Sequence, residues 1–300
     1  MTPSVPAAVD PDWNEVWKMR QESHESSKLT SDPSHDWNKK ENAERYDANA
    51  RGEYDDRVKT TIASLPIDRN SRILDIGAGP GTLAIPLAPF VQEITAVEPG
   101  AGMVGLLKNR AEQQGIRNIT CVQKTWEDIG LTRDLAAPYD IVIASLSLTM
   151  HDIREALKKM DAAASGSVHL FWFVDMPFWE KMYADLWEPL HGRPYYSGPK
   201  ADCLVMVLYQ MGIYPDVTML PIAKEYRFTS REEMLSFFVT RFGATTPLQE
   251  QIVKEYITPR MRQQGSDVVI SGDSTFAHIR WKKKQSKKIE GNNPRHTDLR

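Results

Sequence analysis

Residues 73–88, which read ILDIGAGPGTLAIPLA, constrain the fold more than any other stretch of the chain. A short apolar run leads into three glycines at alternate positions, and a second apolar run of helical character follows. Glycine permits positive φ angles and lets a ligand approach the backbone because it has no Cβ. The first turn of the following helix offers N–H groups without intrahelical partners. We therefore expect a strand, a ligand-binding turn and a helix in succession.

Strand-like and helix-like segments alternate around this turn. Short runs with the length and composition of buried strands lie at residues 72–78, 93–99, 119–124, 139–148 and 167–175. Helix-like stretches lie between them, at residues 82–90, 101–115 and 152–164. This order predicts βαβ units. We expect an α/β fold with a mostly parallel sheet of about seven strands and helices on both faces.

The flanking segments differ in composition from this alternating part. Residues 1–65 are polar with isolated aromatic residues, and we expect them to form an N-terminal helical cap on a main domain of residues 66–282. Within that domain, residues 176–212 are rich in aromatic residues and prolines, which suggests a helical lid. Residues 283–300 are basic and poor in apolar residues, so we expect a disordered tail.

Two local patterns near the C-terminus predict further elements. Residues 229–243 read as a helix that opens with a capping box from Thr229 to Glu232. Residues 266–281 fit either a hairpin turning at SGD or one long final strand.

The composition excludes several classes of protein. A formal net charge of −3 gives no general attraction to nucleic acid or membrane surfaces. The two cysteines are too few for a disulfide framework, and we assign no metal site. The N-terminus lacks a signal-peptide pattern, and no apolar run approaches the roughly 20 residues that span a bilayer. We expect a cytoplasmic protein, and the sequence leaves its oligomeric state open.

An acid closes the second expected strand. Glu98 lies about twenty residues beyond the glycine turn, where a carboxylate can accept both hydroxyls of a ribose. The ligand could be a nicotinamide dinucleotide or S-adenosylmethionine. The dinucleotide pattern needs a third glycine or an alanine where this chain has Thr82. Asp75 would repel a pyrophosphate and attract a sulfonium and an ammonium, which favours S-adenosylmethionine.

The stretches ILDIGAGPGTLAIPLA and AVEPGAGM resemble the class I S-adenosylmethionine-dependent methyltransferases. The resemblance covers roughly residues 70–175 and implies a Rossmann-like fold. It also implies S-adenosylmethionine as cofactor and S-adenosylhomocysteine as product. By this resemblance the cofactor contacts are Asp75, Gly77, Ala78, Gly79 and Gly81 in the loop, Glu98 at the ribose, and Pro99 and Met103 at the adenine.

The resemblance implies further contacts beyond the first two signatures. After the third expected strand, Trp126 would stack on the adenine, or Glu127 or Asp128 would accept from its amino group. The fourth strand supplies Ser145 where the cofactor meets the substrate. Many relatives close an N-terminal segment over the cofactor, which makes Tyr46 the candidate in the cap.

Methyl transfer from a sulfonium is an in-line displacement that requires alignment and exclusion of water. A general base is needed only if the acceptor must lose a proton. His151, just beyond the fourth strand, is the candidate base. The candidate substrate contacts are Asp175 at the end of the fifth strand and Trp179, His191, Tyr195 and Tyr196 in the aromatic lid.

The sequence therefore predicts transfer of a methyl group to an O, N, S or C nucleophile. The aromatic lid and the small net charge indicate a small-molecule acceptor. A protein side chain is the alternative acceptor, and a non-catalytic S-adenosylmethionine-binding protein is the alternative from another class. A nicotinamide oxidoreductase is the third reading. We do not expect nucleic acid as substrate, since SLSLTMHD stands where methylases of base amino groups carry a [DNS]-P-P-[YFW] motif.

Overall fold

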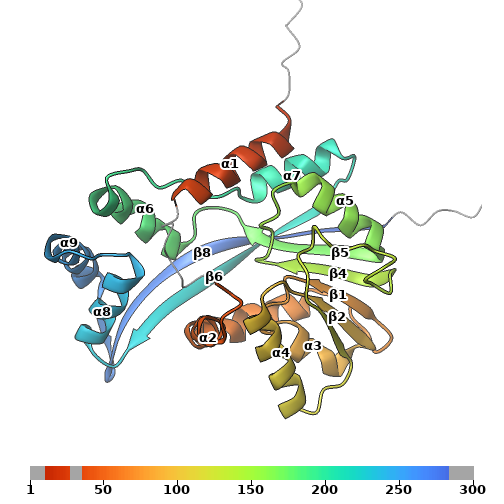
Figure 1. Cartoon of the computed structure of the whole chain (residues 1–300), viewed down its shortest axis with the longest axis horizontal. Helices are drawn as coiled ribbons and strands as arrows, with labels where there is room; N and C mark the ends of the chain where they lie inside the picture. Colours follow the sequence, from red (N-terminus) through yellow and green to blue (C-terminus); the bar gives the residue numbers. More distant parts are fainter. Residues whose placement is uncertain (1–10, 28–35, 284–300) are drawn as a thin grey trace, which may run out of the picture.

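The computed structural model describes residues 11–27 and 36–283, without the side chains of residues 45–56. Figure 1 shows one sheet with helices on both faces and a long two-stranded ribbon that extends from it. The expected disordered tail, apart from Lys283, lies outside the described residues.

The sheet confirms the predicted mostly parallel α/β fold. Its strands are β1 (Arg72–Ile76), β2 (Glu93–Val97), β3 (Ile119–Val122), β4 (Tyr139–Ser145), β5 (Ala164–Phe173), β6 (Asp216–Phe228), β7 (Arg262–Gln264) and β8 (Asp267–Lys282). The order is β3-β2-β1-β4-β5-β8-β6, and β7 pairs with β8. Strands β1 to β5 are parallel to their neighbours, whereas β8 runs antiparallel to both β5 and β6.

The helices cover both faces of this sheet. They are α1 (Trp13–Ser27), α2 (Lys40–Ala63), α3 (Ala84–Leu87), α4 (Ala101–Gln113), α5 (Ile153–Ala163), α6 (Phe178–His191), α7 (Ala201–Gln210), α8 (Arg231–Arg241) and α9 (Pro247–Ile257), with short 3₁₀ turns at Ala88–Phe90 and Thr258–Arg260. Helices α1, α5 and α7 lie on one face, and α2, α3 and α4 lie on the other (Figure 1).

Strand periodicity separates the two cores. Successive side chains of a strand point to opposite faces of the sheet. Leu74 and Ile76 of β1 therefore belong to the core beneath α1, α5 and α7. Ile73 belongs to the core beneath α2 and α3. Trp17 of α1 is fully buried in the first core, so the N-terminal helix is an integral layer of the fold.

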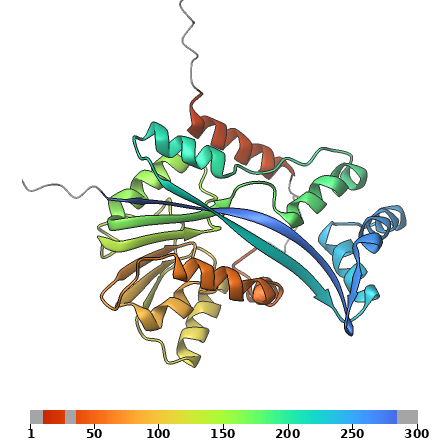
Figure 2. The same cartoon turned by 180° about the vertical axis from the view of Figure 1, so that it is seen from behind.

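The β6–β8 ribbon carries a third core away from the sheet. Of the two alternatives for the last segment, the structure has the single long strand β8. Its residues 268–275 pair only with β6 and β7, because β5 pairs with residues 276–282. Helices α6, α8 and α9 pack on this outer part, as Figures 1 and 2 show. The two helices of the segment expected as a lid, residues 176–212, therefore lie in different places. Helix α6 packs on the ribbon, whereas α7 packs on α1 and α5.

One capping prediction is wrong by one residue. The N-cap of α8 is Ser230, whose side chain accepts a hydrogen bond from the backbone N–H of Glu233. The Glu233 carboxylate in turn accepts from the backbone N–H and the hydroxyl of Thr229. The capping residues Ser230 and Glu233 therefore lie one position after the predicted pair of Thr229 and Glu232, and the Glu233 carboxylate bonds to Thr229 instead of to the N-cap residue.

Two histidines are buried against each other where β5 and β8 pair. His169 Nδ1 lies 2.9 Å from His278 Nε2, and His169 Nε2 lies 2.9 Å from the hydroxyl of Ser167. Burial lowers the pKa of both imidazoles, and the nearby Arg280 guanidinium lowers both further. Both rings are therefore neutral in the folded protein at neutral pH.

This pair predicts sensitivity to mild acid. Below the ordinary histidine pKa the unfolded chain binds protons that the folded chain excludes, so the free energy of unfolding decreases as pH falls. The decrease is at most about 1.4 kcal/mol per pH unit for each imidazole. Urea unfolding between pH 7 and pH 5 measures it. His278→Gln should reduce this slope, whereas His151→Asn, at an exposed histidine, should not. An unchanged slope in His278→Gln would contradict the assignment.

Candidate functional site

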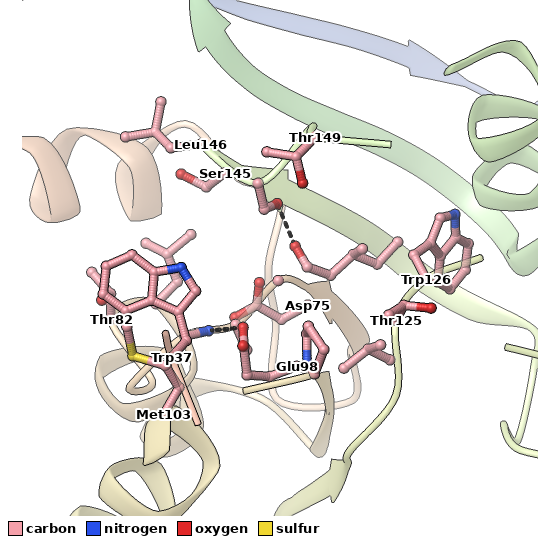
Figure 3. Close-up of a pocket in the computed structure, with 18 of the residues that line it drawn as sticks. Trp37, Asp75, Thr82, Glu98, Met103, Thr125, Trp126, Ser145, Leu146 and Thr149 are labelled. Atoms are coloured by element: carbon pink, nitrogen blue, oxygen red, sulfur yellow. Dashed lines mark hydrogen bonds between the residues drawn. The ribbon is translucent and has the colours of Figure 1, made fainter. Parts of the chain in front are cut away.

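A cavity of about 400 Å³ opens at the carboxyl ends of β1, β2 and β4. Its walls come from the glycine loop, the ends of these strands, the start of α4 and the segment that precedes α2. In Figure 3, Asp75 and Glu98 lie next to each other between Met103 on one side and Trp126 on the other. Ligands of open α/β sheets bind at this edge of the strands.

The three loop glycines have different roles, although all have positive φ angles. A Cβ on Gly77 would lie 2.2 Å from Cβ of Ser147, so this glycine permits a close approach between two loops. A Cβ on Gly81 would lie 2.8 Å from Ile85 Cγ1, which makes its role one of helix packing. Gly79 has no atom within 4 Å of such a Cβ. Its backbone is therefore the open part of the loop.

Glu98 holds the loop in place from the end of β2. Its Oε2 accepts from the N–H of Gly79 at 3.0 Å, and its Oε1 accepts from the N–H of Gly100 at 2.8 Å. The side chain is 7% exposed. Burial raises the pKa of this carboxyl, and the two N–H donors oppose the shift. A carboxylate oxygen can accept a second hydrogen bond, so Glu98 keeps acceptor capacity toward the cavity.

Asp75 is a buried acid with an unused oxygen. It is 2% exposed, and its Oδ2 has no hydrogen-bond partner among the described residues. Burial, with the neighbouring Glu98 charge as a smaller contribution, raises the pKa of Asp75 to about 7. An orphaned carboxylate oxygen of this kind is satisfied by a ligand with a positive charge or a donor group.

The structure brings most of the predicted cofactor residues into this cavity. Those in its wall are Asp75, Gly77, Ala78, Gly79, Glu98, Pro99, Met103, Trp126, Glu127 and Ser145. Gly81 is not in the wall. The side chain of Tyr46 lies outside the described residues. The indole of Trp126 belongs to the core, where its Nε1 donates to the carbonyl of Ala156 at 3.1 Å. This bond ties the Trp126 ring to the core.

His151 does not line the cavity. Its side chain is 60% exposed, and its Nε2 lies 3.0 Å from a carboxylate oxygen of Glu22. This contact belongs to the docking of α1 on the loop after β4. Trp17 Nε1 donates to the carbonyl of Met150 at 2.9 Å, and Gln21 Nε2 donates to the carbonyl of Thr149 at 3.2 Å.

Among the wall residues that the sequence did not predict, Trp37 and Arg57 come from the segment before the glycine loop. Trp37 is held at the N-terminus of α4, because its carbonyl accepts from the N–H of Gly102 at 3.0 Å. Arg57 of α2 donates to the hydroxyl of Ser145 at 3.2 Å. Trp37 is conspicuous as an isolated aromatic residue in a polar segment, whereas no local pattern distinguishes Arg57.

The loop after β4 carries backbone strain. Leu146 has a φ of 57°, in the left-handed region that non-glycine residues rarely adopt. The Ser147 hydroxyl fixes this loop by donating to the carbonyl of Ile76 at 2.6 Å. Leu146, Ser147 and Thr149 all line the cavity. Strained loops of this type are concentrated at functional sites.

A second cavity of about 360 Å³ adjoins the first, and Thr149 lines both. Of the predicted substrate residues, Trp179 and Tyr195 line it. His191 instead donates from Nε2 to the carbonyl of Phe242, and Tyr196 is 49% exposed. Asp175 is exposed and lies 3.8 Å from the Lys181 ammonium. These three residues line neither cavity.

The family profile described as "Methyltransferase domain" matches residues 73–165, from β1 to the start of β5. Residues 73–165 are therefore similar to methyltransferase domains. The match includes the glycine loop, Glu98 and the loop after β4, which together form most of the first cavity.

Three proteins are similar to this chain over different lengths. An uncharacterized protein of Haemophilus influenzae is 25% identical over 221 residues, covering 73% of this chain and 79% of that protein. The uncharacterized methyltransferase YcgJ of Bacillus subtilis is 31% identical over 90 residues, covering 30% of this chain and 34% of YcgJ. A structure from Bacillus halodurans C-125, assigned as a methyltransferase, superposes with a TM-score of 0.50 at 14% identity, covering 75% of this chain and 97% of that one. This last similarity shows a shared fold.

Within residues 11–27 and 36–283, no three His, Cys, Asp or Glu side chains group as ligands for a metal ion. No helix in the same part of the chain combines the length and the apolar character needed to cross a bilayer.

The buried acid Asp75 predicts an unusual pH dependence of stability. Its folded pKa lies above the unfolded value, so the unfolded state loses its proton first as pH rises. Relative to Asp75→Asn, the ligand-free wild type should lose stability by about 1.4 kcal/mol per pH unit between pH 4 and pH 7, and no more above pH 7. Urea unfolding of both proteins measures the difference. Asp175→Asn, at an exposed acid, should show none; a flat difference for Asp75→Asn would contradict the prediction.

Proposed function

We propose that this protein transfers a methyl group from S-adenosylmethionine to a small-molecule acceptor. The observation that carries this proposal is the combination of two buried acids, Asp75 and Glu98, with the open backbone of Gly79 in one cavity. The match to methyltransferase domains supports the same reaction class.

The residues of the first cavity fit the chemistry of S-adenosylmethionine. The unpaired oxygen of Asp75 is suited to a cationic ligand, and it would repel the pyrophosphate of a dinucleotide. Glu98 would accept the ribose hydroxyls with its remaining lone pairs. Pro99 and Met103 offer apolar surface for the adenine. When bound, the cofactor supplies a methyl group on a positively charged sulfur.

The protein's contribution is to orient the acceptor and to exclude water. The second cavity would hold the acceptor, because it meets the first at Thr149. Its volume of about 360 Å³ suits a small molecule. Helix α1 forms part of its wall through Gln21 and His24, so the proposed N-terminal cap of residues 1–65 would belong to the active site.

Calorimetric titration of the purified protein with S-adenosylmethionine, S-adenosylhomocysteine and NAD tests this proposal. We expect the two sulfur compounds to bind and NAD not to bind. Glu98→Gln should weaken binding by about 1–3 kcal/mol, roughly fivefold to 150-fold, since a buried acceptor of two N–H groups becomes an amide. Glu93→Gln, at the other end of β2, is the matched control. Binding of NAD alone would refute the proposal, and binding without turnover of any acceptor would favour the non-catalytic alternative.

Gly79→Ala provides a second test. The new Cβ would meet no protein atom, so the cost in stability should be the strain of a left-handed alanine, about 1–2 kcal/mol. The same methyl group would enter the space beside the cavity and hinder the cofactor. We expect a folded protein with at least tenfold weaker S-adenosylmethionine binding, as measured by thermal unfolding and calorimetry. Unchanged affinity would show that the ligand does not approach this backbone.

A further inference from the structure

The second cavity has an aromatic wall. Helix α6 supplies Trp179, Tyr183 and Trp187, and the end of β5 supplies Trp172 and Phe173. Tyr195 completes the set from the loop after α6 and stacks on Tyr183 with ring centroids 6.1 Å apart. A wall of this kind binds flat, apolar groups by burial and by ring stacking.

Four of these rings already have a cation of the protein over them. The pairs, with the distance from cation to ring centroid, are Lys200 with Phe173 at 5.7 Å, Lys224 with Trp179 at 4.9 Å, Arg241 with Tyr183 at 5.5 Å and Arg193 with Trp187 at 5.9 Å. A cationic acceptor would compete with these groups for the same ring faces and would be repelled by them. The aromatic wall therefore disfavours an amine cation.

The polar groups of the wall favour an anion. The carboxylate of Glu180 is already satisfied, because it pairs with Lys200 at 2.9 Å and accepts from the Tyr195 hydroxyl at 3.1 Å. Among the described wall residues, the cations Lys200 and Arg241 outnumber this one acid. The indole Nε1 of Trp187, a residue only 3% exposed, has no hydrogen-bond partner there. This indole N–H is therefore a hydrogen-bond donor for which the described residues provide no acceptor.

Given the proposed methyl transfer, on which this step rests, we infer that the second cavity binds a planar aromatic acid. The acceptor's ring lies among the aromatic side chains, and its anionic group accepts from Trp187 Nε1 near Lys200 and Arg241. The methylated atom is a ring hydroxyl oxygen directed toward Thr149, where the two cavities meet.

His24 is the base for that hydroxyl. It lines the second cavity, and its Nδ1 lies 2.9 Å from the carbonyl oxygen of Tyr196, so Nδ1 carries the proton and Nε2 has the free lone pair. The acceptor hydroxyl gives its proton to Nε2. The oxygen forms a bond to the methyl carbon as the bond from that carbon to sulfur breaks, and sulfur keeps the electron pair. The products are a methyl ether, S-adenosylhomocysteine and an imidazolium that returns its proton to water.

Three probes with one ring and one chain length test the charge of the acceptor. They are 4-hydroxyphenylacetate, 2-(4-hydroxyphenyl)ethanol and tyramine, titrated by tryptophan fluorescence into full-length protein saturated with S-adenosylhomocysteine; 6-hydroxy-2-naphthoate serves as a larger acid. We expect the acids to bind at least about tenfold more tightly than the alcohol, and tyramine not to bind. Equal or tighter binding of tyramine would overturn the inference. So would failure of both acids to bind a protein that binds S-adenosylhomocysteine, whereas failure of the latter to bind would refute the proposed function itself.

Two substitutions test the named residues. Trp187→Phe keeps a ring but removes the N–H, and should weaken binding of the acids about tenfold without changing S-adenosylmethionine affinity. Trp281→Phe, which removes an indole N–H bonded to Asp161, is the matched control. His24→Gln should leave acid affinity within about twofold and lower kcat for transfer of tritiated methyl about a hundredfold. Loss of affinity with unchanged kcat would overturn the role of His24 as the base.

Discussion

The shape of the first cavity depends on the carboxylate of Glu98. One oxygen accepts from Gly79 and the other from Gly100, so a single side chain ties the loop after β1 to the start of α4. Such bonds to an ionised acceptor are strong where water is excluded. The carbonyl of Val97 also accepts from the N–H of Gly77 at 2.8 Å. The end of β2 therefore holds the glycine loop in position.

This arrangement buries the carboxyl groups of Asp75 and Glu98 side by side. Burial of two neighbouring acids lowers the stability of the fold. Each acid loses hydration, and the charge of Glu98 further opposes the ionisation of Asp75. The hydrogen bonds of Glu98 offset part of that cost, but Asp75 Oδ2 has no such partner in the described part of the chain. A cationic ligand would offset the remainder. Under the proposed function, the destabilised pair would be a site preorganised for positive charge.

Helix α1 connects this site to a second one. Its contacts with the carbonyls of Thr149 and Met150 fix the loop after β4, and its next turn places His24 in the aromatic cavity. Most of that cavity lies outside residues 73–165, the part that matches methyltransferase domains. Under the proposed function, the cofactor and the acceptor would therefore be bound by different parts of the chain, and the matched segment would not specify the acceptor.

The sequence alone determined the sheet, the glycine loop and the two acids, because parallel βαβ order brings the ends of neighbouring strands to one edge. Tertiary structure decided the rest. Trp126 points into the core and His151 pairs with α1 because residues distant in sequence meet them there. Trp37 and Arg57, from the N-terminal segment, line the first cavity, and His24, from the same segment, lines the second cavity. No local pattern encodes these contacts, since each depends on how segments distant in the chain pack together.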